Sequence, residues 1–123
     1  MHLQKRILLI DDDHDHLLIC SIILQDNGYL VSTMVGCEDM EDLRATIRTF
    51  QPDLIYMDHD MKHICGDDLT RMLKAHPEFK AIPVIYFTGR SDIEELARKA
   101  GANGYFKKPF EIAGLLETTR IYL

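Results

Sequence analysis

The chain has 123 residues, of which 46% are hydrophobic and 28% charged, which is ordinary for a globular protein. This length allows one hydrophobic core and not two, so we expect a single domain over residues 1–123 with no second domain attached. The formal charge of −6 argues against a broad nucleic-acid surface, which needs a basic patch. No run reaches the roughly 18 to 20 apolar residues of a membrane span, and no signal peptide opens the chain.

Five short runs of strand-forming residues alternate with helical patterns along the chain. The runs cover residues 6–10, 30–35, 53–57, 83–87 and 104–107. Three of them are almost uninterrupted apolar stretches, as expected for parallel strands covered on both faces. The second contains Ser32 and Thr33, which favours a place at the edge of the sheet.

The segments between these runs have the periodicity of helices. Residues 17–24 are apolar nearly all round, which predicts that the first helix is the most buried one. Ser91 and Glu94 have the spacing of a capping box at the start of the fourth helix. The last helix is predicted from about residue 111 to the C-terminus. Five strands alternating with five helices predict an α/β fold, a doubly wound (βα)5 parallel sheet.

Chemically active side chains follow four of the predicted strands. Asp11 and Asp12 follow the first strand, Asp58 the third, Thr88 the fourth and Lys108 the fifth. Because the carboxyl ends of neighbouring parallel strands meet at one crevice, these groups are expected to lie together.

Three carboxylates brought together repel one another unless a hard cation lies between them, so the pattern indicates Mg²⁺. A phosphoryl group on a carboxylate needs such a cation, a hydroxyl donor and an ammonium group. Carboxylates are known nucleophiles in phosphoryl transfer. The strand ends therefore indicate phosphoryl chemistry on an aspartate.

Four motifs in order make the chain closely resemble the receiver domain of two-component response regulators, over nearly its whole length. They occupy residues 7–13, 52–58, 82–89 and 101–110. The resemblance implies a flavodoxin-like sheet with strand order 2-1-3-4-5. It also implies a cytoplasmic, stand-alone regulatory switch with no output domain. Such a switch is not an enzyme in the usual sense, since it catalyses only its own phosphorylation and dephosphorylation.

The resemblance assigns a role to individual residues and partners. Asp58 would accept the phosphoryl group from a sensor histidine kinase or a histidine phosphotransfer protein. Thr88 and Lys108 would bind the phosphoryl oxygens, and Tyr105 would follow Thr88 as a switch residue. Signalling would use the face of the fourth helix, fifth strand and fifth helix, which could also form a homodimer. The downstream protein target is not implied.

The same resemblance implies the ligands of Mg²⁺ and one unusual peptide bond. Asp11, Asp12 and Asp58 would hold the ion together with the backbone carbonyl of Asp60. The bond between Lys108 and Pro109 is expected to be cis.

The loop after Asp58 departs from the family pattern. Lys62 stands where a proline is usual, which should loosen the loop and the carbonyl at Asp60. Cys65 stands where an acid or asparagine is usual. We also expect Asp60 and Arg90 to pair across the mouth of the site and restrict the water that hydrolyses the aspartyl phosphate.

Three other interpretations remain open. The sequence Asp58-His59-Asp60 fits the D-x-D signature of a phosphohydrolase of the haloacid-dehalogenase type. The chain could instead be an interaction module whose acids have lost their chemistry.

Four histidines near the acids could form a transition-metal site, because imidazole suits zinc, copper and nickel: His14, His16, His59 and His63. The three cysteines are odd in number and widely spaced, which favours a reducing cytoplasm over a disulfide framework.

Overall fold

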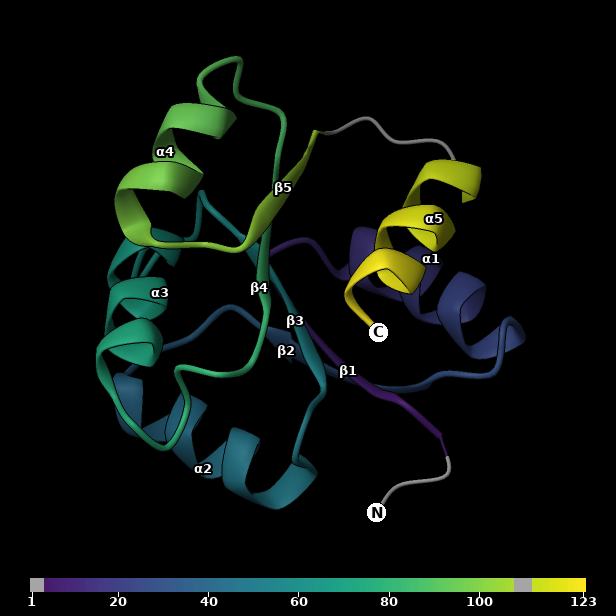
Figure 1. Cartoon of the computed structure of the whole chain (residues 1–123), viewed down its shortest axis with the longest axis horizontal. Coiled ribbons are helices and arrows are strands. Elements are labelled where there is room, and N and C mark those ends of the chain that lie inside the picture. The colour runs from purple at the N-terminus through teal and green to yellow at the C-terminus, as the bar shows by residue number, and fades with distance from the viewer. Residues whose placement is uncertain (1–3, 108–111) are drawn as a thin grey trace.

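The computed structural model describes residues 4–107 and 112–123, which form one parallel sheet with helices on both faces (Figure 1). The strand order β2-β1-β3-β4-β5 confirms the predicted topology, with β2 at an edge. The strands are β1 (Arg6–Asp11), β2 (Leu30–Val35), β3 (Leu54–Asp58), β4 (Val84–Thr88) and β5 (Gly104–Lys107). The helices are α1 (His14–Asp26), α2 (Met40–Phe50), α3 (Gly66–Ala75), α4 (Ile93–Ala100) and α5 (Ile112–Tyr122).

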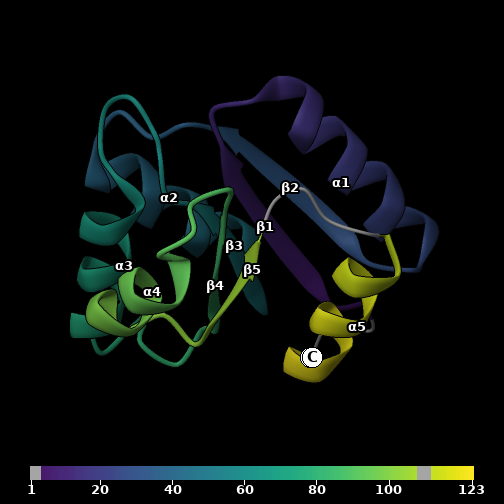
Figure 2. The ribbon, with the colours of Figure 1, turned by 90° about the horizontal axis from the view of Figure 1, so that it is seen from above.

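Alternating side chains of the strands build two cores, one on each face of the sheet. Leu8 and Ile10 point into the core under α2, α3 and α4, whereas Ile7 and Leu9 point toward α1 and α5. Figure 2, which views the molecule from above, shows these two layers of helices on opposite sides of the sheet. Each central strand is therefore buried on both faces, which explains its nearly continuous apolar sequence.

Three strands end one residue later than the sequence indicated, and this changes how the acids are held. Asp11, Asp58 and Thr88 are the last residues of their strands rather than the first residues of loops. Asp58 and Thr88 each take part in parallel pairing, opposite Phe87 and Lys107 respectively. The backbone of the sheet thus fixes these residues directly.

Helix α1 is less buried than its sequence predicted, and that prediction was wrong. Leu17, Cys20 and Leu24 are buried against the sheet, but Leu18 and Ile22 on the outer side are about half exposed. A helix in an outer layer can bury only the side that faces the sheet, however apolar the rest of its surface is.

The ends of the helices are fixed in different ways. Asp13 caps α1 because its carboxylate accepts hydrogen bonds from the backbone N–H groups of Asp15 and His16. The capping box predicted at Ser91 and Glu94 is wrong, because α4 begins after Asp92 and has no side-chain cap.

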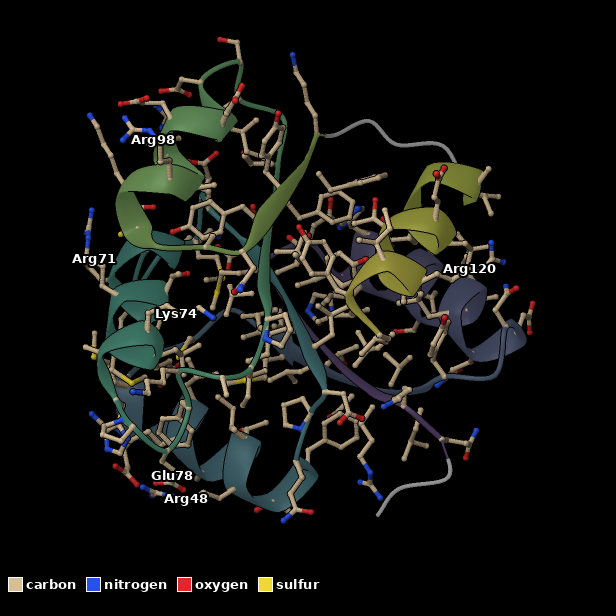
Figure 3. The ribbon with its side chains drawn as sticks, in the orientation of Figure 1. Arg48, Arg71, Lys74, Glu78, Arg98 and Arg120 are labelled. Atoms are coloured by element: carbon tan, nitrogen blue, oxygen red, sulfur yellow. The ribbon has the colours of Figure 1, made fainter. Side chains whose placement is uncertain are left out.

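Charged side chains lie on the outer sides of the helices (Figure 3). Arg48 on α2 forms two hydrogen bonds of 3.0 Å with Glu78, which follows α3 in the chain. This ion pair lies on the surface, where such pairs contribute little to stability.

None of the helices in the described parts of the chain combines the length and the apolar character of a membrane span.

Candidate functional site

Asp11, Asp58 and Thr88 come together at one edge of the sheet. Strands β1, β3 and β4 are neighbours in that order, and the three residues end them. All three are buried, with 4%, 6% and 2% of their surface exposed, respectively. Because they end neighbouring parallel strands, the predicted convergence of these three residues is present. A buried carboxylate is costly unless hydrogen bonds or a cation compensate its charge, so each acid needs partners.

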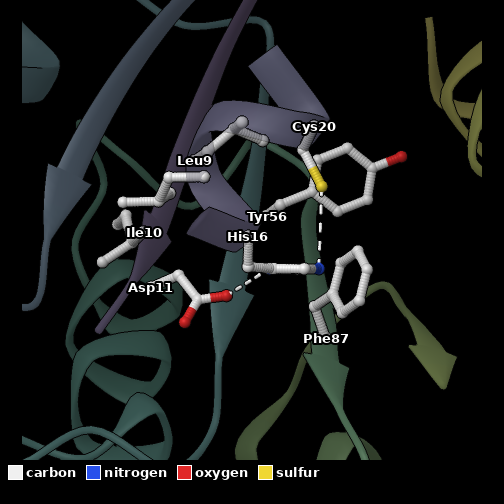
Figure 4. Close-up of a pocket in the computed structure, with 8 residues that line it drawn as sticks. Leu9, Ile10, Asp11, His16, Cys20, Tyr56 and Phe87 are labelled. Atoms are coloured by element: carbon white, nitrogen blue, oxygen red, sulfur yellow. Dashed lines mark hydrogen bonds and ion pairs between the residues drawn. The ribbon is translucent and has the colours of Figure 1, made fainter. Parts of the chain in front are cut away.

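Asp11 is held by partners from the start of α1. One carboxylate oxygen lies 2.5 Å from Nδ1 of His16, and the other accepts the backbone N–H of Asp13 at 3.0 Å. Figure 4 shows His16 lying between Asp11 and Cys20 and against the ring of Phe87, beside a small cavity. The two rings meet edge to face with their centroids 4.6 Å apart. His16 thus orients Asp11, a role that its position in the sequence did not indicate.

Asp12 points toward two loops rather than along the sheet. One of its carboxylate oxygens accepts the backbone N–H of Lys62 at 2.8 Å. The other lies so close to Gly36 that a Cβ atom there would approach it to 2.5 Å. Gly36 also has a φ of +71°, which favours glycine. The loops after β2 and β3 therefore both depend on the position of Asp12.

These acids fit Mg²⁺ in kind, because that ion prefers carboxylate and carbonyl oxygens. Among residues 4–107 and 112–123, however, no three His, Cys, Asp or Glu side chains are grouped so as to hold a metal ion. The histidines proposed for a transition-metal site, His14, His16, His59 and His63, form no such group among these residues; His16 contacts Asp11, and His59 contacts Asp60 and Asp67. In this structure Asp12 is engaged with the backbone N–H of Lys62.

Asp60 lies at the mouth of the site and contacts Thr88. Its Oδ2 accepts the hydroxyl of Thr88 at 3.1 Å, and its backbone N–H donates to Oδ1 of Asp58 at 3.3 Å. The predicted pairing with Arg90 is present, at 3.6 Å between Nη1 and Oδ1. Arg90 is held more closely by two hydrogen bonds to Asp92, at 3.0 and 3.1 Å. The effect of this pairing on hydrolysis stays a prediction.

His59 is a second partner of Asp60. Its Nδ1 lies 2.9 Å from Oδ1 of Asp60. Burial by itself would lower the pKa of His59, but its hydrogen bonds to Asp60 and Asp67 outweigh burial and leave the pKa above the usual value. Burial would raise the pKa of Asp60, but the hydrogen bonds from His59 and Thr88 lower it below the usual value. Asp60 is thus held as a carboxylate.

The last two predicted functional residues, Tyr105 and Lys108, belong to β5 and the segment that follows it. Tyr105 lies on β5 with just under half of its surface exposed (46%), on the face that the resemblance assigned to signalling. Lys108 and the Lys108–Pro109 bond lie outside the described residues, so their predicted roles are not tested.

The chain matches the family model described as "Response regulator receiver domain" over residues 7–120. It is 29% identical to the polar-differentiation response regulator DivK of Brucella ovis, covering 97% of this chain and 96% of that protein. It is 30% identical over 113 residues to an uncharacterized 76.5 kDa protein of Thiocystis violacea, covering 90% of this chain but only 16% of that protein.

Solved structures agree with the sequence comparisons. The chemotaxis protein CheY4 of Vibrio cholerae superposes with a TM-score of 0.85 at 25% identity, covering 98% of this chain and 99% of that one. A putative response regulator from Chloroflexus aurantiacus gives a TM-score of 0.86 at 26% identity, covering 97% of both chains. These matches do not favour the alternative of a phosphohydrolase with a D-x-D motif at Asp58 and Asp60.

Proposed function

Because the chain belongs to the response regulator receiver domain family, we propose that it is a phosphorylation switch in which Asp58 accepts the phosphoryl group. The observation that carries this proposal is the burial of Asp58 at the end of β3, between the strands that end in Asp11 and Thr88. The donor is a phosphohistidine of a sensor histidine kinase or a histidine phosphotransfer protein.

Each residue of the site has a definite part in the transfer. A carboxylate oxygen of Asp58 forms the new bond to phosphorus, while the bond from phosphorus to the donor imidazole breaks and the imidazole leaves. The hydroxyl of Thr88 then donates to one phosphoryl oxygen, and the ammonium group of Lys108 pairs with another. Such donors act well here because the site is buried and largely shielded from water.

Asp11, Asp12 and Asp58, with the carbonyl of Asp60, are the residues that would hold Mg²⁺. When bound, the ion neutralises charge on the attacking carboxylate and the transferred group. The hydrogen bond that Oδ2 of Asp12 accepts from the N–H of Lys62 competes with its use as a ligand.

The switch follows from the position of Thr88. The hydroxyl of Thr88 donates to Asp60 in this structure. The hydroxyl must leave Asp60 before it can donate to a phosphoryl group carried by Asp58. Tyr105 on the neighbouring strand β5 follows this motion and alters the face formed by α4, β5 and α5. That face binds the downstream protein or a second copy of the chain. We propose that the domain acts in the cytoplasm.

Incubation with acetyl phosphate and Mg²⁺ followed by mass spectrometry tests the proposal. The wild-type protein is expected to gain one phosphoryl group and Asp58→Ala none. Asp26→Ala, which removes an exposed acid at the end of α1, is the control and gains the group as wild type does.

Three outcomes would contradict the proposal. Labelling of Asp58→Ala would place the chemistry on another residue. An unlabelled wild type would indicate an interaction module without phosphoryl chemistry. Continuous hydrolysis of phosphomonoesters would indicate a phosphohydrolase.

The substitution Lys62→Pro is expected to strengthen Mg²⁺ binding. Proline has no backbone N–H, so the hydrogen bond that now holds the Asp12 carboxylate is lost. The loss of one competing hydrogen bond should lower the dissociation constant by about two- to tenfold. Calorimetric titration of the unphosphorylated protein with Mg²⁺ measures this. Lys62→Ala keeps the N–H and should bind as wild type does; equal affinities in the two variants would refute the role given to this N–H.

A further inference from the structure

A chain of hydrogen bonds links the core to the mouth of the site. The hydroxyl of Tyr86, on β4, donates to Oδ1 of Asp67 at 2.6 Å. The other oxygen of Asp67, on α3, lies 3.1 Å from Nε2 of His59. Because Nδ1 of His59 contacts Asp60, which in turn accepts the hydroxyl of Thr88, the chain ends at the switch residue.

This chain is anchored in the rigid part of the molecule. Tyr86 is completely buried in the core beneath α3, and the burial of its hydroxyl is compensated by Asp67. His59 is also buried, and each of its ring nitrogens has a carboxylate partner. These contacts leave one orientation for the imidazole.

Asp60 is the exposed end of this chain of contacts. About half of its side chain (54%) is exposed, so solvent alone would allow several rotamers. The imidazole of His59 fixes Oδ1, which turns Oδ2 toward Thr88. The position of the Thr88 hydroxyl is therefore set through Asp60 by groups in the core.

We propose that Tyr86, Asp67 and His59 are positioning residues that form a brace, holding Asp60 on Thr88 and so favouring the resting state of the switch. The inference rests on the proposed function, because it concerns the competition between two acceptors for one hydroxyl hydrogen. In the resting state the acceptor is Asp60, and after phosphorylation it is an oxygen on the group carried by Asp58. A weaker brace shifts the equilibrium toward the second arrangement.

The substitution Tyr86→Phe tests the brace by removing one hydroxyl group. Two changes are expected relative to wild type. The methyl resonance of Thr88 in the ligand-free protein shifts in NMR spectra, because its hydroxyl is less firmly held. The affinity for the phosphoryl analogue beryllofluoride, with Mg²⁺, rises about two- to tenfold, the range for one hydrogen bond. Asp67→Ala breaks the same brace at its middle and is expected to act in the same direction.

Tyr56→Phe is the matched control. Tyr56 is also buried, but it lies on the other face of the sheet, where its hydroxyl is 2.6 Å from that of Thr119. This variant also loses one buried hydroxyl, so a general loss of stability would affect both variants alike. The Thr88 methyl resonance and the analogue affinity should stay at wild-type values in Tyr56→Phe.

A double-mutant cycle decides whether the brace acts through Asp60. In an Asp60→Ala background, Tyr86→Phe should change neither the Thr88 resonance nor the analogue affinity. Equal effects with and without Asp60, an equal effect of Tyr56→Phe, or an unmoved Thr88 resonance in Tyr86→Phe would each overturn the proposal. If wild type binds no analogue, the proposed function fails, while the ligand-free Thr88 resonance still decides whether the brace exists.

Discussion

The substitution Gly66→Ala is expected to destabilise the protein by about 1–3 kcal/mol, the range for forcing extra atoms into a packed site. A Cβ atom at Gly66 would lie 2.5 Å from the backbone oxygen of Asp58 and 3.1 Å from Cα of His59. Both are backbone atoms, which cannot rotate away. The start of α3 and the end of β3 must therefore move apart, which displaces the Asp58 carboxylate.

Phosphorylation by acetyl phosphate should also slow in Gly66→Ala, by about tenfold to a hundredfold if the reacting carboxylate is displaced by an ångström. Helix propensity alone gives the opposite sign, since alanine is the better helix former by about 1 kcal/mol. Urea denaturation and the labelling rate measure the two effects. A variant as stable and as reactive as wild type would show that α3 does not approach β3 this closely.

Gly114→Ala in α5 is the control for this prediction. There a Cβ atom would meet the edge of the Phe106 ring at 3.3 Å, a contact that a side chain can relieve by a small rotation. We expect its stability to stay within about 1 kcal/mol of wild type.

The second large effect is expected in α1, where two apolar residues close in sequence should behave differently. Leu24→Ala should cost about 2–5 kcal/mol, the range for truncating a fully buried leucine. Ile22→Ala should change stability by no more than about 0.5 kcal/mol, as is usual for surface positions. The reason is burial, since Leu24 is 0% exposed and Ile22 is 50% exposed.

Chemical denaturation of the two variants under the same conditions measures this difference. Equal losses would mean that α1 is covered on both sides, as its sequence alone suggested. A small loss in Leu24→Ala would mean that α1 is not packed on the sheet as described.

The prediction for α1 failed because apolar periodicity reports which residues can be buried and not whether another layer covers them. The strand order was predicted correctly because it followed from the family resemblance, which rests on four motifs along the chain rather than on composition. The same motifs placed Asp11, Asp58 and Thr88 at one edge, which parallel pairing confirms.

The finer contacts of the site could not be read from the sequence. Nothing in the spacing indicates that Asp12 accepts the N–H of Lys62, 50 residues away. An acid such as Asp67 in the first turn of a helix is usual for electrostatic reasons, so its contacts with His59 and Tyr86 gave no signal. These contacts depend on how α3 lies against β4, which only tertiary packing determines.

Trapping the modified residue in the unaltered protein decides whether Asp58 is the residue that carries the phosphoryl group. Borohydride reduces an acyl phosphate to a primary alcohol, so a phosphorylated aspartate is converted to homoserine. After treatment with acetyl phosphate and Mg²⁺ followed by borohydride, peptide mapping by mass spectrometry is expected to find homoserine at position 58 and at no other acid. Homoserine at Asp11, Asp12 or Asp60, or at no position, would contradict the role proposed for Asp58.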